Sequence, residues 1–438
     1  MRAMNHGPAV DGSESARPEE GRFKTQAFVI AAVVGVFLVG LLFRGAFPTP
    51  FSDEFYFYEI YLKARQGDFD LQTMVQPHFG HVYVLLKSWF WAVVHYQLDW
   101  RVSMYAQAAF MVLTMAMVAH YSLVKTSSKI RLLLAVSAAL ALGSARQWEN
   151  LYWALQISAA SMFFFTIAAF YWVDRYAESQ DGMQAILASI CGLMALLSNG
   201  GGLASFVITM AALVVVCRKN SLRLIFAVIE IVFVALVFMY MLPSGGGAVG
   251  ASLMSPGNFI TYVLAFFANA LFSFSERGDD VYSLCLGAAV LGCTAYTIKI
   301  SWNSRYEKVF AYLLIGFSLA SCLMIAYARL KGGHWQPNAS RYYTFALPLL
   351  LGNLLILGSS RSRVDLRLSL GLAGLIIASF AQSYLVEWKT SPHRFAYSKE
   401  AHSNLCRGSS SGLAFHDGLE TTNIQVLQDV FCSAAEKN

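Results

Sequence analysis

The amino-acid sequence predicts an all-α protein that crosses a membrane many times. Of its 438 residues, 57% are hydrophobic and 13% are charged, whereas soluble domains average about 25% charged residues. The mean hydropathy is +0.51, and the apolar residues form continuous runs instead of the alternating pattern of a membrane β-barrel. Because a helix satisfies its own backbone hydrogen bonds, such runs are expected to cross lipid as helices.

Eleven apolar runs approach the roughly 20 residues that a helix needs to cross a bilayer. They lie at 26–43, 102–124, 130–146, 151–173, 182–197, 201–217, 222–242, 281–299, 307–327, 341–358 and 366–385. We therefore expect a polytopic transmembrane helical bundle of about 11 spans at 26–385. The polar segment 1–25 is expected to be a disordered cytoplasmic N-terminus, and 386–438 an extracytoplasmic tail.

The basic residues predict the orientation of this bundle. With the N-terminus inside, four inner loops carry three Lys or Arg residues each, as the positive-inside rule requires. These loops are 125–131, 218–223, 299–308 and 359–367. Counting the apolar stretch 81–98 as one more span would invert every later loop and put all four basic loops outside. We therefore expect 81–98 and 257–274 to lie along the outer interface or to re-enter the membrane.

The same composition excludes several classes of function. The net charge of +6 is spread over short loops, so we expect membrane lipids and no nucleic acid as partners. No Cys and His residues have the spacing of a zinc site. Cys406 and Cys432 fall in the polar tail, where they form either a disulfide or two unpaired thiols.

Two adjacent acids, Asp53 and Glu54, follow the first span and open the first outer loop, at 44–101. A carboxylate in this place can take the proton from an acceptor hydroxyl as it attacks a sugar. Alternatively, the pair can hold a divalent cation against a donor phosphate, or cap an amphipathic helix. Because the elaborate loops all fall on the outer side, we place the candidate active site there.

A basic loop at 328–340 is an exception on the predicted outer side, and an anionic ligand would explain it. Arg binds phosphate as a planar fork and Lys as a point charge. The phosphate-binding candidates in and beside this loop are Arg329, Lys331, His334 and Arg341. The ring of Trp335 can pack against a sugar. Contact with anionic lipids is the alternative explanation of the same charges.

Polar residues also gather in the segment RQWENLYWALQ at 146–156. Glu149 lies three residues from Arg146 and can pair with it on a helical turn, while Asn150 can bond a sugar hydroxyl. The alternative is an interfacial Trp belt with a hydrogen-bonded clamp between helices.

Two histidines and a glycine-rich segment complete the set of candidates. His78 and His81 are three residues apart; we favour contact with sugar or phosphate over a metal, because nothing marks a third ligand. The segment SNGGG at 198–202 indicates a tight link between two spans.

Two of these features together resemble the GT-C superfamily of polytopic glycosyltransferases. The first is a span followed by an outward loop that opens with an acidic pair and continues as YEIYLKARQGDFD; the second is SRYYTFALPLLLGNLLIL, with Arg341, Tyr342 and Pro348. The segment QPHFGH departs from the Pro-Pro-Leu type of that family. The resemblance implies interfacial helices in the first outer loop and use of a polyprenyl-phosphate-linked sugar.

The resemblance also implies roles for the candidate residues. Asp53 would be the catalytic base, and Glu54 would assist or orient it. The donor phosphate would contact Arg329, Lys331, His334 and Arg341. Residues expected to contact the substrate are His78, His81, Glu149, Asn150, Trp335 and Tyr342. No cofactor is assigned, and a divalent cation is left open.

The sequence is therefore interpreted as an integral-membrane glycosyltransferase. It would move a sugar from a polyprenyl-phosphate donor to a glycan or lipid acceptor at the outer face of a bacterial inner membrane, in polysaccharide biosynthesis for the cell envelope. A transporter or flippase of a lipid-linked glycan is the alternative, for which Glu230 is the one mid-span acid. A polysaccharide polymerase or ligase would be expected to have a larger late outer loop than 328–340.

Overall fold

The computed structural model describes residues 17–48, 50, 52–78, 81, 83–126, 130–241, 256–272, 281–329, 339–409 and 421–432. Across these residues the secondary structure is helical, apart from one isolated β-bridge between His78 and His81. The long helices are α1 (Arg17–Gly45), α5 (Val102–Lys125), α8 (Ile157–Ser179), α11 (Asn220–Met241), α13 (Val281–Ser301), α14 (Val309–Arg329), α15 (Tyr343–Ser359) and α16 (Arg363–Cys406).

Shorter helices connect or flank these long ones. The α-helices are α2 (Tyr58–Gln66), α3 (Leu71–Val75), α4 (Val84–His95), α6 (Arg131–Leu142), α7 (Glu149–Tyr152), α9 (Gly182–Ser198), α10 (Gly202–Val216), α12 (Pro256–Ala268) and α17 (Thr421–Phe431). The 3₁₀ turns are η1 (Ser52–Phe57), η2 (Ala145–Gln147), η3 (Ala154–Gln156), η4 (Trp302–Glu307) and η7 (Ser340–Tyr342).

The all-helical, membrane-type architecture is confirmed. Each of the eleven predicted apolar runs contains a helix, and seven helices among the described residues are long and apolar enough to cross a membrane. Three others, α6, α9 and α10, have 12, 17 and 15 residues. The number of eleven spans stays a prediction.

The two ambiguous apolar stretches form helices that are too short to cross a bilayer. Helix α4 has 12 residues and α12 has 13, which at 1.5 Å per residue gives about 18–20 Å against a hydrocarbon core of about 30 Å. Their lengths agree with the prediction that neither stretch is a full span.

The N-terminal segment differs from the expectation of disorder. Helix α1 begins at Arg17, so residues 17–25 are helical. The sequence here suits a helix start, because Pro18 is tolerated in a first turn and Glu19 and Glu20 interact favourably with the helix dipole.

Glycines allow neighbouring helix backbones to approach closely. A Cβ at Gly287 of α13 would lie 2.0 Å from the carbonyl oxygen of Leu264 in α12, and one at Gly352 of α15 would lie 2.7 Å from that of Ala311 in α14. Without a hydrophobic driving force between helices in lipid, such close packing is a main source of their association.

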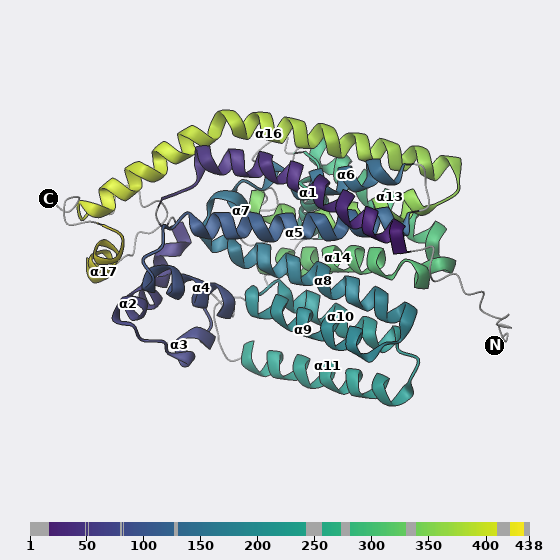
Figure 1. Cartoon of the computed structure of the whole chain (residues 1–438), viewed down its shortest axis with the longest axis horizontal. Coiled ribbons are helices and arrows are strands. Elements are labelled where there is room, and N and C mark those ends of the chain that lie inside the picture. The colour runs from purple at the N-terminus through teal and green to yellow at the C-terminus, as the bar shows by residue number, and fades with distance from the viewer. Residues whose placement is uncertain are drawn as a thin grey trace.

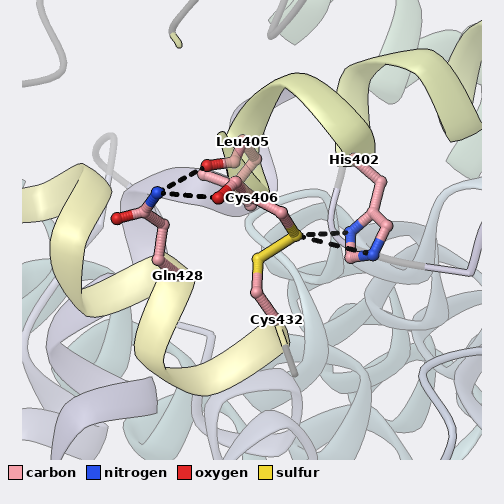
Figure 2. Close-up of a disulfide and its surroundings, with 5 residues drawn as sticks. All are labelled: His402, Leu405, Cys406, Gln428 and Cys432. Carbon is pink, nitrogen blue, oxygen red and sulfur yellow. Dashed lines mark hydrogen bonds between the residues drawn. A yellow bond between two sulfur atoms is a disulfide. The ribbon is translucent and has the colours of Figure 1, made fainter. Parts of the chain in front are cut away.

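The C-terminal tail folds back on the first loop. Helix α16 has 44 residues, about 66 Å at helical rise, so it is longer than a bilayer is thick, and Cys406 at its end forms a disulfide with Cys432. Of the two states that the sequence left open for these cysteines, the structure has the disulfide. Gln428 of α17 donates to the carbonyl oxygens of Leu405 (2.9 Å) and Cys406 (3.2 Å) (Figure 2).

Aromatic contacts fix α17 against the first loop. The ring of Phe431 lies 5.2 Å from Tyr61 of α2 and 5.4 Å from Trp100, edge to face in both cases. Figure 1 shows α2, α3, α4 and α17 at the same end of the long helices, and the start of α1 at the other end. The bundle therefore has one elaborate end and one end of short connectors.

Candidate functional site

Three segments far apart in the sequence meet at the elaborate end of the bundle. They are η1, which carries the acidic pair, the α7–η3 turn at 149–156, and η7, which carries Arg341. Contacts join η1 to η3 and α7 to η7. This end therefore brings together the first-loop acids, Glu149, Asn150 and Arg341.

Glu54 is a buried anchor between two of these segments. Its side chain is 1% exposed; Oε1 accepts a hydrogen bond from the backbone N–H of Leu155 at 2.7 Å, and Oε2 accepts one from Trp100 Nε1 at 3.3 Å. Both oxygens accept hydrogen bonds inside the protein, so Glu54 ties η1 to the α7–η3 turn and to Trp100.

Asp53 is the more accessible acid of the pair. Its side chain is half-buried, where that of Glu54 is buried. Its charge acts on Arg341 and contributes, after burial, to raising the pKa of Tyr56. Since Glu54 holds η1 in place, the position of Asp53 next to it is fixed as well.

Glu149 binds the start of η7 through its whole carboxylate. Oε1 pairs with Nη1 of Arg341 at 3.1 Å, and Oε2 accepts from the Ser340 hydroxyl and the Arg341 backbone N–H, each at 2.8 Å. The expected partner Arg146 instead donates to Asn269 Oδ1 at 2.7 Å. The pairing with Arg146 was wrong, because a tertiary partner replaces the neighbour on the turn.

Asn150 clamps the same segment. Its Nδ2 donates to Thr344 Oγ1 at 2.7 Å and to the Arg341 carbonyl oxygen at 3.3 Å, while its buried Oδ1 has no hydrogen-bond partner among the described residues. Asn150, Gln147 and Thr344 line a cavity of about 20 Å³. A cavity of this size fits a single water molecule and no sugar ring.

The two histidines lie on a β-bridge, not on a helix. Each backbone N–H donates to the other residue's carbonyl oxygen, at 2.8 and 2.9 Å. The ring of His78 packs 4.2 Å from that of Phe57. A Cβ at Gly200 would lie 2.0 Å from His81 Nδ1, so the glycine-rich link at 198–202 is one place where the first loop contacts the bundle closely.

Neither histidine belongs to a three-ligand group among the residues that the structure describes. The group found there is His402, Cys406 and Cys432, and the two sulfur atoms of that group are joined as a disulfide (Figure 2). Oxidised in this way, they are not thiolate ligands for a metal.

The remaining candidates fall partly outside the described residues. Tyr342 is buried in η7. The Arg341 guanidinium carbon lies over the Tyr342 ring, 5.4 Å from the ring centroid. Arg329 is the last residue of α14. Lys331, His334 and Trp335 lie outside the described residues.

Sequence reasoning missed several residues that hold this end together. Lys87 is 4% exposed and donates to the carbonyl oxygens of Thr73 (2.8 Å) and Gln76 (2.6 Å). The sequence signal for Lys87 was a lysine inside an aromatic, apolar stretch. The sequence around Trp100 and Ser340 gave no such signal, because their roles depend on Glu54 and Glu149, which are remote in sequence.

Comparison with known proteins found no match: no protein-family model matches the chain, and neither does any curated protein.

The variant Glu149→Gln tests the role of the buried ion pair. The Glu149 side chain is 10% exposed and that of Arg341 30%, so loss of the carboxylate leaves a partly buried guanidinium without its ion-pair partner. We expect a cost of about 2 kcal/mol, seen as a lower melting temperature of the detergent-solubilised protein. Arg101→Gln is the control, because its exposed pair with Asp99 is worth about 0.5 kcal/mol or less. Equal melting temperatures of the two variants would contradict the assigned role.

The burial of His78 leads us to expect that the folded protein loses stability on mild acidification. Burial first, and then the charges of Lys87 and His81, lower the His78 pKa to about 4 from about 6.5 in an unfolded chain. As pH falls from 6.5 toward 4, the unfolded state takes up this proton first, so folding free energy is lost in that window. We expect the melting temperature to fall less between pH 7 and pH 5 in His78→Phe than in the wild type. The exposed His393 supplies the control His393→Gln, which should keep the wild-type pH dependence.

Proposed function

We propose that the protein is an integral-membrane glycosyltransferase that moves a sugar from a polyprenyl-phosphate donor to a glycan or lipid acceptor at the outer face. The observation that carries the proposal is the convergence of Asp53, Glu149 and Arg341 at one end of the bundle, from three segments held by buried carboxylates. Each segment alone is compatible with a structural role.

Asp53 is the proposed general base. The acceptor oxygen attacks the anomeric carbon, the bond from that carbon to the phosphate oxygen breaks, and Asp53 takes the acceptor's proton. A base needs exposure to substrate and a fixed position. The half-buried Asp53 offers both, since the Glu54 contacts with Leu155 and Trp100 hold η1 rigid.

Arg341 is the proposed partner of the leaving phosphate. The polyprenyl phosphate gains negative charge as the sugar leaves, and a fixed cation stabilises that charge most in the transition state. Glu149 holds Arg341 through a 3.1 Å ion pair and a bond to its backbone N–H. Glu149 and Asn150 would therefore act as positioning residues for Arg341.

Two independent features support placing this site outside the cytoplasm. The disulfide between Cys406 and Cys432 lies in the tail that packs on α2, and disulfides persist in oxidising compartments. At the other end lie Lys125, Lys308 and Arg361, which come from three of the basic connectors and line one cavity, as expected for the cytoplasmic side.

The position of Glu230 argues against the alternative function, a transporter of a lipid-linked glycan. Glu230 lies on α11, which packs against α10 at the edge of the bundle in Figure 1. A transport path would be expected to place its charged residues near a central axis between repeats.

The proposal is tested by restoring a gene deletion with the wild type, with Asp53→Asn or with Asp68→Asn. Removal of a general base lowers transfer by about 10²–10⁴-fold, so we expect Asp53→Asn to leave the surface glycan missing. Asp68 is an exposed acid of the same loop, so Asp68→Asn should restore it. Mass spectrometry of the surface glycan and of the lipid-linked donor on the outer leaflet gives the readout.

The two readouts separate the competing functions. Loss of glycan with donor still present outside supports the transferase. Loss of donor from the outer leaflet would indicate a flippase, and full restoration by Asp53→Asn would contradict the catalytic assignment.

A further inference from the structure

A cavity of about 530 Å³ opens at the end of the bundle opposite Asp53. It lies between the C-terminal end of α5, the turn η4 with the first residues of α14, and the C-terminal end of α15. Its volume falls within the roughly 300–1,000 Å³ typical of small-molecule sites. The proposed transfer chemistry makes no use of this cavity.

Three cations among the described residues line the cavity, and two of them form no ion pair within the described part of the chain. Lys125 lies 3.5 Å from Asp174 and pairs also with Glu178. Lys308 and Arg361 form no ion pair with any residue that the structure describes. One exposed acid, Glu307, also lines the cavity.

Beneath these charges the cavity has an apolar floor. Ala311, Leu355 and Ile356 line it and are at most 5% exposed. Lys308 is half-buried beside them, and this burial lowers its pKa. A cation held out of water in this way is stabilised by an anion that enters the cavity.

The cavity also lies where the headgroups of a bilayer would be expected if the surrounding helices cross it. It is built at the ends of three helices that are long and apolar enough to cross a membrane, within Val102–Lys125, Val309–Tyr327 and Ser340–Ser359. Basic pockets between transmembrane helices on the cytoplasmic side suit the phosphate of an anionic lipid. A lipid would place its phosphate at Lys308 and Arg361 and its apolar part on the floor.

We propose that this cavity binds the phosphate group of an anionic membrane lipid at the inner face, with Lys308 and Arg361 as its ligands. The site is separate from the candidate transfer site and does not depend on the function proposed for it. An aqueous phosphate offers the same chemistry, and the test distinguishes the two sources.

Native mass spectrometry of the purified full-length protein with added phosphatidylglycerol tests the site. The variant carries Lys308→Gln and Arg361→Gln together. Its control carries Lys299→Gln and Arg367→Gln, which remove the same charge from exposed positions in the same connectors outside the cavity. We expect about tenfold weaker phosphatidylglycerol binding in the variant and wild-type binding in the control. Equal lipid binding by the variant and the control would overturn the proposal.

A second arm uses inorganic phosphate alone. Phosphate binding that the Lys308→Gln and Arg361→Gln changes abolish, with no difference in phosphatidylglycerol binding, would overturn the lipid as the source. If the double variant fails to fold, the single variant Arg361→Gln replaces it, because Arg361 is exposed, and Arg367→Gln is its control. The phosphatidylglycerol and phosphate measurements are then read in the same way.

Discussion

The contact between Glu149 and the start of η7 is the interaction on which the elaborate end of the bundle depends. One carboxylate binds the Arg341 guanidinium, the Arg341 backbone N–H and the Ser340 hydroxyl. A partly buried charge is costly unless all its hydrogen-bonding capacity is used, and here the partners come from a segment 191 residues away. The pair therefore joins two distant parts of the chain in one geometry.

Glu54 repeats this device at the first loop. Its two oxygens bind Leu155 and Trp100, so the loop is tied to the turn that follows Glu149. Together the two acids connect η1, the α7–η3 turn and η7, which also share one apolar core. This arrangement leaves Asp53 and Arg341 at the surface of a rigid frame, which is the property that a preorganised site requires.

The sequence predicted the helices well because long apolar runs have one stable form in lipid. It placed the acids, Glu149 and Arg341 at one end, and it left the tail cysteines open between a disulfide and two unpaired thiols. It named Asp53 as the base and Glu54 as the acid that assists or orients it. It did not reveal that Glu54 is buried and bonded to Leu155 and Trp100, because adjacent acids differ only through tertiary contacts. The expected ion pair between Glu149 and Arg146 is absent for the same reason. Sequence spacing shows which residues are neighbours on a helix, whereas tertiary packing decides which of them form an ion pair.

The central claim is that Asp53 faces the outside of the membrane, and thiol labelling in intact cells tests it most directly. Asp53→Cys and Arg361→Cys are compared, since they lie at opposite ends of the bundle, and the unmodified chain measures labelling of its five free cysteines. The account predicts that a membrane-impermeant reagent labels the introduced thiol at 53 in intact cells and the one at 361 after permeabilisation. Labelling at 361 but not at 53 in intact cells would contradict it.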